Sequence, residues 1–453
     1  MNYISLILVC VAALALFFWK ARLGFLLFVF FSPFDNFLFW DVLGFKVKIY
    51  QVFLLAGLLT FLLQNLLSKA RIKKDPLVPL LLVYWAVGFI SLSRATNATD
   101  AFVILVIELM SIAAYFLVVQ SARTGDLLLK SLQAMIISAN FIAVLSVFQV
   151  VGYNLGLKTR VIQTDQYSWG RPVGTFFESN YLGAFALSIT LIILSLLTSK
   201  AVVINRTYLR VSLLLQLTGL GLSVTRGAWV GLAVGLLLLP WLLVLTGEKK
   251  WGARVLSTAS LAAIMVLLAS AVLFLFLPSV PREIWGRVGS IGSLNLDTRS
   301  YSTESVRLSK MQAAMQFIKK SPWIGYGPGQ GGELYKEFYW YDPDQSYSRR
   351  GAGAANLFLS VTFQRGLLGL VIFVPFLGAL LTRTVAAMKR PEDVRIQAIL
   401  KSVFLGVCGL LFTFMFSEAH LLAFFWVMLG LLTAAQNAGG SARAQALAPE
   451  APR

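Results

Sequence analysis

The stretch NYLGAFALSITLIILSLLT, residues 180–198, is nineteen residues long and contains no charged side chain. About 20 consecutive apolar residues, wound as a helix, are needed to cross the hydrocarbon core of a bilayer. Similar runs recur along nearly the whole chain of 453 residues, of which 58% are hydrophobic and only 13% charged. Soluble domains carry roughly 25% charged residues. The sequence therefore predicts an all-α polytopic membrane protein and excludes a chain of two or three soluble domains.

Thirteen segments fit the pattern of a membrane-spanning helix. The second is the weakest, because Pro33 interrupts it near its end. If the first two segments form one broken element, the count falls to twelve, so we expect about 12–13 transmembrane helices. The predicted spans are residues 3–19, 23–34, 49–68, 77–93, 101–121, 129–152, 180–198, 208–224, 227–246, 255–278, 356–382, 397–416 and 421–436.

The 39 Lys and Arg residues exceed the 20 Asp and Glu residues, which gives a net charge of +19. The basic residues concentrate in alternate loops, for example between residues 69 and 74 and at Lys249 and Lys250. Cytoplasmic loops of membrane proteins collect Lys and Arg, so we expect these loops and the C-terminus in the cytoplasm. No basic helix or aromatic–basic stripe lies outside the predicted spans. Nucleic-acid binding is therefore not expected.

This topology divides the chain into six segments. They are N-terminal transmembrane helices (1–152), an outer loop (153–179), central transmembrane helices (180–277), a large outer domain (278–354), C-terminal transmembrane helices (355–436) and a disordered cytoplasmic tail (437–453). Within the large outer domain, Thr303–Lys320 has apolar residues at helical spacing, which predicts an amphipathic helix. Its predicted apolar face is Val306, Met311, Met315, Phe317 and Ile318.

Residues that hold metals or nucleotides are scarce. The chain has one histidine, His420, and one carboxylate pair at helical spacing, Glu333 and Glu337, in the large outer domain. A zinc or two-metal centre needs a denser set of ligands, and such a pair is more typical of a solvated helix face. The sequence also lacks a glycine-rich phosphate loop of the Walker type. We therefore expect a chain that works without a metal or other cofactor.

Cationic residues gather instead at the outer ends of the spans. Arg171 precedes the seventh span, Arg226 lies in a short turn between two spans, and Arg307 lies on the predicted outer helix. Each could extend to the interface and contact lipid headgroups. A guanidinium fork also suits bidentate binding of phosphate. Three arginines around one outer cavity would suit a pyrophosphate anchored in the membrane.

Two ionisable residues lie within predicted spans, Glu108 in the fifth and Arg365 in the eleventh. Such residues are candidates for function by default, although a mutual ion pair would also explain them. A transporter or lipid flippase would use the two as a coupling pair. Transporters usually place such charges near the midplane, in broken spans of matching halves. Here the arginines gather at the outer face, which favours chemistry on a lipid-linked substrate over transport.

Four short motifs, taken in order, resemble the superfamily of O-antigen ligases and Wzy-type O-antigen polymerases, which are bacterial inner-membrane glycan transferases. Each motif is weak alone, but together they surround one large outer domain. They are GTFFESN (174–180), TRGAW (225–229), Arg307 followed by SPWIGYGPG (321–329), and ANLFL (355–359) followed by RGLLG (365–369).

The resemblance implies a fold similar to type C glycosyltransferases, with a large helical periplasmic loop. It implies metal-independent, inverting transfer of a glycan from undecaprenyl pyrophosphate at the periplasmic face of the inner membrane. Ligases use lipid A–core as acceptor, polymerases another lipid-linked glycan, and a third branch protein serines. We expect a ligase. Its partners would be the undecaprenyl pyrophosphate-linked donor, the lipid A–core acceptor and membrane lipids, and the protein would be a monomer.

The resemblance also assigns roles to individual residues. Arg226 and Arg307 would bind the donor diphosphate and act in catalysis. Arg171, Asn180 and Asn356 would complete the donor site.

One position departs from the family pattern. The family has a histidine, the proposed base, immediately before the asparagine that matches Asn356, whereas this chain has Ala355. Alanine cannot accept a proton. Either the chain is an inactive variant that keeps donor binding without the base, or another residue, His420 or Glu178, supplies the base.

Overall fold

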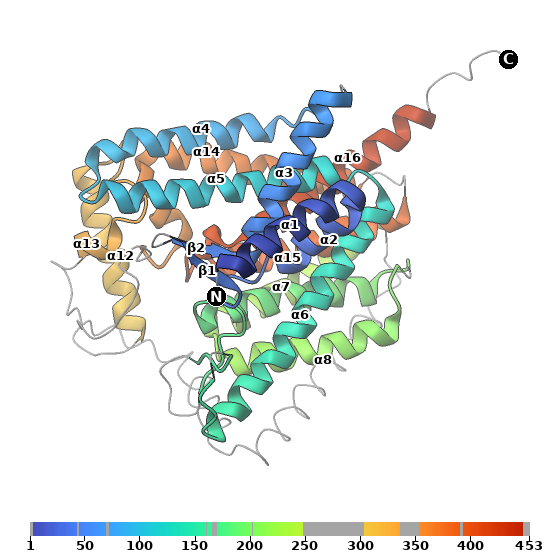
Figure 1. The fold of residues 1–453 in the computed structure, drawn as a ribbon, viewed down its shortest axis with the longest axis horizontal. Coiled ribbons are helices and arrows are strands. Elements are labelled where there is room, and N and C mark those ends of the chain that lie inside the picture. The colour runs from blue at the N-terminus through green and yellow to red at the C-terminus, as the bar shows by residue number, and fades with distance from the viewer. Residues whose placement is uncertain are drawn as a thin grey trace.

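The computed structural model describes residues 3–42, 45–68, 72–159, 161–164, 170–201, 203–247, 303–335, 353–389 and 393–446. Within these ranges the protein is a bundle of helices with one small hairpin (Figure 1). The helices are α1 (Tyr3–Trp19), α2 (Ala21–Phe31), α3 (Ile49–Ser68), α4 (Leu77–Ser91), α5 (Ala98–Ser121), α6 (Gly125–Asn154), α7 (Ser179–Thr198), α8 (Arg206–Ser223), α9 (Arg226–Leu245), α12 (Thr303–Lys320), α13 (Gly331–Leu334), α14 (Leu357–Met388), α15 (Val394–Thr413) and α16 (Ala423–Ala446). The hairpin pairs β1 (Phe39–Val42) antiparallel with β2 (Phe45–Lys48).

The prediction of an all-α polytopic membrane protein is confirmed. Eight described helices are long and apolar enough to cross a membrane, namely α3 to α7, α9, α14 and α15. Three shorter apolar segments join them, in α1, α2 and α16. The predicted span 255–278 lies outside the described residues. The first two predicted spans form two separate helices, α1 and α2, of which α2 has 11 residues.

Helix α7 is the centre of the bundle, and nearly all of its residues are buried inside the protein. It packs against α8, α9 and α15, and α7 and α15 lie in the middle of the view in Figure 1. Small residues allow these helices to approach closely, as is common in membranes. A side chain added at Gly231 of α9 would meet Thr413 Oγ1 at 2.7 Å, and one at Gly409 of α15 would meet Leu191 at 2.4 Å.

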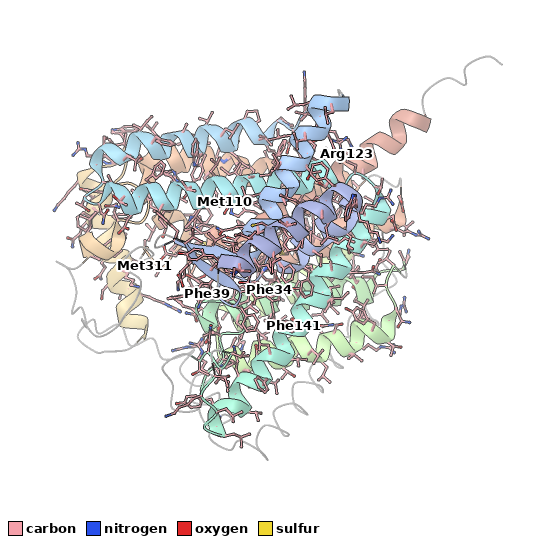
Figure 2. All side chains as sticks on the ribbon, viewed as in Figure 1. Phe34, Phe39, Met110, Arg123, Phe141 and Met311 are labelled. Atoms are coloured by element: carbon pink, nitrogen blue, oxygen red, sulfur yellow. The ribbon has the colours of Figure 1, made fainter. Side chains whose placement is uncertain are left out.

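The two ends of the bundle carry different elements. Helices α4, α5 and α14 run side by side along the length of the bundle, with α12 and α13 at one end and the end of α16 at the other (Figure 1). Figure 2 places Met311 of α12 and Arg123 at opposite ends. Arg123 belongs to a predicted cytoplasmic loop and Met311 to the predicted outer domain. Elements that the sequence predicts on opposite sides of the membrane thus lie at opposite ends of the bundle.

Helix α12 has the bounds predicted from the sequence, and its predicted apolar face is confirmed at Phe317 and Ile318 but not throughout. Ala313, Ala314 and Phe317 are buried in a small cluster with Phe363 of α14, whereas Met315, predicted on the apolar face, is 44% exposed. Alanine contributes little to an apolar pattern, but its small side chain lets α12 pack closely on α14. Helix α12 runs across the end of the bundle, at a steep angle to α4 and α5 (Figure 1).

Helix α14 is interrupted, although the sequence predicts one unbroken span over 356–382. Gly366 has φ 64° and ψ −166°, which is not helical. A side chain there would lie 2.1 Å from the carbonyl carbon of Trp323, so only glycine allows this contact. The glycine-rich segment 321–329 fills the break, and Gly325 also has a positive φ, of 68°.

Four backbone hydrogen bonds join the broken helix to this segment. A break exposes amide and carbonyl groups, which are costly to bury without partners, and the segment provides those partners. The bonds are Tyr326 N to Phe363 O (2.9 Å), Gly327 N to Gln364 O (2.9 Å), Leu367 N to Pro322 O (2.7 Å) and Leu368 N to Trp323 O (3.2 Å). The motifs SPWIGYGPG and RGLLG are thus two halves of one structural unit.

Helix α16 continues to Ala446, into the segment 437–453 that the sequence predicts to be a disordered tail. The extension is rich in alanine, which has the highest helix propensity of all residues. Residues 447–453 lie outside the described residues.

Candidate functional site

Arg171 organises the start of α7. It is 4% exposed, and its Nε donates to Ser223 O at 2.6 Å. Its Nη2 donates to Asn180 Oδ1 at 3.1 Å and to Thr225 Oγ1 at 3.2 Å. One guanidinium therefore fixes the first turn of α7 against the turn between α8 and α9.

The turn between α8 and α9 consists of Val224 and Thr225, and α9 begins at Arg226. Val224 has φ 46°, a conformation that is rare for a β-branched residue. Gly183 of α7 allows the turn to approach, because a side chain at this position would lie 2.6 Å from Thr225 Oγ1. Arg226 is half-buried and lies at a helix N-terminus, where the unpaired amides and the helix dipole also favour an anion.

A small pocket lies where the turn before α9, helix α12 and the end of α15 meet the start of α7. It is lined by Asn180, Thr225, Gly227, Arg307, Thr413, Phe416 and Ser417. Arg307 is half-buried, and both chain neighbours of Arg226 are in the pocket wall. The structure thus brings Asn180, Arg307 and the turn that carries Arg226 together. Arg171 holds Asn180 and the turn by hydrogen bonds.

The segment before α14 lies beside this pocket. Asn356 caps the helix: its Oδ1 accepts from Leu359 N at 3.0 Å, and its Nδ2 donates to Met415 O at 2.9 Å. Ala355 is 9% exposed and has φ 54°. Among the described residues, it and Val224 are the two non-glycine residues with a positive φ. Such strain concentrates at functional sites. Ala355 directly precedes Asn356, and Val224 lies in the turn just before Arg226.

The two residues that the sequence offers as alternative bases have different environments. Glu178 is half-buried at the N-cap position of α7. His420, in a short turn of 3₁₀ helix (Ala419–Leu421), is only 2% exposed. Burial, and then the nearby Arg365 guanidinium, lower the pKa of His420 to about 4. The imidazole is therefore neutral at pH 7 and closed to a large acceptor.

Glu418 is a candidate that the sequence analysis missed. Its Oε1 accepts from Gly353 N at 2.6 Å, and its Oε2 accepts from Ser360 Oγ at 2.6 Å. Burial raises the pKa of Glu418 to about 7, against the opposing effects of Ser360, Lys310 and Gly353. The available signal was an isolated carboxylate in the turn between the last two spans, in the sequence Ser-Glu-Ala-His of residues 417–420. A search for carboxylate pairs passes over it.

The intramembrane pair Glu108 and Arg365 and two tyrosines of the outer domain take part in packing. Arg365 is fully buried, forms an ion pair with Glu108 of α5 and donates to Tyr84 OH at 3.1 Å. The aromatic rings of Tyr326 and Tyr335 contact Phe363 in the cluster beneath α12. Trp323 is 65% exposed. Other aromatic residues of the outer domain, among them Tyr339, Trp340, Tyr341 and Tyr347, lie outside the described residues.

Metal ligands do not cluster in the part of the chain that the structure describes: no three His, Cys, Asp or Glu side chains there could hold a metal ion together. Glu337 of the predicted carboxylate pair lies outside the described residues.

Part of the chain matches a known protein family. Residues 211–374, just over a third of the chain, match the family described as O-Antigen ligase. The matched segment contains Arg226, Arg307, Ala355 and Asn356, whereas Arg171, Glu178, Asn180, Glu418 and His420 lie outside it. No curated protein matches the chain.

Proposed function

We propose that this multi-pass membrane protein, whose residues 211–374 match the O-antigen ligase family, transfers a glycan from undecaprenyl pyrophosphate to lipid A–core. The transfer takes place at the periplasmic face of the bacterial inner membrane. The domain supports an enzyme of the glycosyltransferase type in general. The donor, the acceptor, the membrane and its face are our proposal.

The pocket that Arg307 shares with the turn of Arg226 carries this proposal. A pyrophosphate leaving group develops negative charge as its bond to the sugar breaks. Arginines that already stand in place can stabilise that charge without reorganisation. The N-terminus of α9 adds its dipole to the same site. These features together suit a diphosphate attached to a lipid.

The neighbouring residues would hold the site in shape. Arg171 fixes Asn180 and Thr225, so both pocket residues keep their positions when the site is empty. The Asn356 side chain caps α14 and bonds to Met415, so we propose that it shapes the acceptor side. A hydroxyl of the acceptor would attack the anomeric carbon opposite the pyrophosphate, which inverts the configuration. Ala355 contributes no proton acceptor to this step.

Two alternatives differ in the acceptor alone. A Wzy-type polymerase would pass the glycan to another lipid-linked glycan, and a protein O-oligosaccharyltransferase would pass it to serine. Both would use the same diphosphate site. A transporter or lipid flippase is a different class. Its proposed coupling pair, Glu108 and Arg365, forms an ion pair between α5 and α14, away from the arginine pocket, so we favour transfer.

Product analysis tests the proposal. The protein is reconstituted in lipid vesicles with lipid-linked oligosaccharides extracted from membranes of the source cells. Lipid A–core, a second lipid-linked oligosaccharide and a serine peptide are offered as acceptors. We expect glycosylated lipid A–core and release of undecaprenyl pyrophosphate, from the chain as it stands or from Ala355→His. Movement of the donor lipid across vesicles, with no transfer to any acceptor, would instead support a flippase.

A further inference from the structure

We infer that Glu418 accepts the proton of the attacking hydroxyl, in place of a side chain at position 355. This inference rests on the proposed function, because it assigns a residue to the transfer step. It also chooses between the two explanations for Ala355: the chain has moved its base to another element and remains active.

The position of the carboxylate is the main observation. Glu418 bonds to Gly353 N, and its second oxygen bonds to Ser360, whose Oγ accepts from Ala354 N at 2.9 Å. These contacts bracket Ala355 on both sides. The Glu418 carboxyl therefore lies against the part of the chain where a histidine side chain would start. Each of its oxygens can accept a second hydrogen bond.

The carboxylate is also next to the arginine pocket. Ser417, the preceding residue, lines that pocket together with Arg307. Lys310, one helical turn after Arg307 on α12, acts electrostatically on Glu418. Glu178, at the start of α7, does so as well. Glu418 thus lies where α7, α12 and the start of α14 meet, and it is half-buried, so a hydroxyl can reach it.

Gly353 is required for this arrangement. A side chain at position 353 would lie 1.3 Å from Glu418 Oε2 and 2.1 Å from its Cδ. A residue without a side chain therefore occupies the position where the Glu418 carboxyl contacts the backbone of Gly353.

The electrostatic environment suits a proton acceptor. A base works best when its pKa lies near the working pH, and burial brings the pKa of Glu418 to about 7. The charged neighbours oppose one another, since Lys310 lowers this pKa and Glu178 raises it. His420, in contrast, is buried with a pKa near 4, which makes it a weak base out of reach.

The step balances without another reactant. The hydroxyl oxygen forms a bond to the anomeric carbon, and its proton passes to Glu418. The bond from that carbon to the phosphate oxygen breaks, and its electron pair leaves with undecaprenyl pyrophosphate beside the arginines. Glu418 then releases the proton to solvent.

The test combines Glu418→Gln with Ala355→His. Glu418→Gln should reduce transfer at least ~10²-fold, the low end for loss of a general base, while thermal-shift binding of undecaprenyl pyrophosphate stays unchanged. Adding Ala355→His to that variant should restore transfer, because it returns a base to the same place. Asp126→Asn is the matched control, since this carboxylate pairs with exposed Lys130 at the opposite end of the bundle, and it should transfer at the original rate.

The outcomes separate the inference from the proposed function. Transfer by Glu418→Gln at the original rate overturns the inference, and so does a loss that Ala355→His fails to restore, because Glu418 would then only hold the backbone. An inactive parent chain that gains at least ~10²-fold from Ala355→His alone also overturns it.

If Glu418→Gln does not fold, Gly353→Ala displaces the carboxyl, and undiminished transfer by that variant refutes the role. If neither the parent nor Ala355→His transfers to any acceptor, the proposed function itself fails.

Discussion

Replacing Gly366 by alanine should uncouple α14 from the segment 321–329. The new Cβ would lie 2.1 Å from the carbonyl carbon of Trp323, 2.2 Å from its oxygen and 2.5 Å from Ile324 N. All three are backbone atoms, so no side-chain rotation relieves the clash. The segment must move away, and the backbone of residue 366 must leave a conformation that is essentially restricted to glycine.

The expected loss of stability is the sum of the backbone strain and the lost hydrogen bonds. Backbone strain in this region costs about 1–3 kcal/mol. The four hydrogen bonds between the segment and the break contribute roughly 1 kcal/mol each, net of solvent. If two to four of them are lost, Gly366→Ala lowers the free energy of unfolding by about 3–7 kcal/mol. That is a large fraction of the 5–15 kcal/mol typical of folded proteins.

Gly378→Ala is the matched control. It changes the same residue type in the same helix, and no atom lies within 4 Å of the added Cβ. Alanine is the better helix former, so this variant should be unchanged or up to about 1 kcal/mol more stable. Reversible denaturation in mixed micelles, followed by circular dichroism, measures both variants. Equal stability of the two would show that the break does not depend on the contact with Trp323.

Three further predictions concern the site. Arg226→Ala and Arg307→Ala should each weaken undecaprenyl pyrophosphate binding, with lysine a partial rescue because it lacks the guanidinium fork; full affinity in Arg226→Lys and Arg307→Lys would argue against bidentate contacts. A cysteine replacing Arg307 should react with an impermeant thiol reagent added from the periplasmic side, in a Cys10→Ala, Cys408→Ala background, and reaction from the cytoplasmic side alone would reverse the topology. Transfer should rise as the pH increases through about 7, where Glu418 loses its proton, and this rise should be absent in Glu418→Gln. Stability should change in the opposite direction: the folded chain holds a proton that the unfolded chain releases near pH 4.5, so Glu418 lowers stability as the pH increases from about 4.5 to 7.

The helices could be predicted because their signal is local. An apolar run of the right length is a helix wherever it packs, so each predicted span inside the described residues corresponds to a helix. The break at Gly366 was missed because RGLLG is itself apolar, and its partner segment lies some forty residues earlier in the chain. Nothing at residues 365–369 alone indicates that contact.

The candidate site likewise contains residues that the sequence could select and residues that it could not. Arg171, Arg226 and Arg307 could be selected because each is a charge in an apolar setting, and their joint role stays a prediction. Glu418 was missed because its importance comes from Gly353 and Ser360, more than fifty residues earlier. The buried face of α12 was predicted only in part. Phe317 and Ile318 belong to it, whereas Ala313 and Ala314 were missed because alanine is a weak signal in any hydrophobic pattern, and proximity to α14 decides their burial.

The origin of the pocket wall has a consequence for biosynthesis. The wall comes from α7, from the turn before α9, from α12 and finally from residues 413–417. The ribosome delivers these parts in that order, and Met415, which receives the bond from Asn356, is among the last. Until α15 enters the membrane, a nascent chain carries its arginines on an open surface with one wall missing. The pocket is therefore complete only near the end of synthesis, so a stalled or truncated chain would not use the proposed lipid-linked donor.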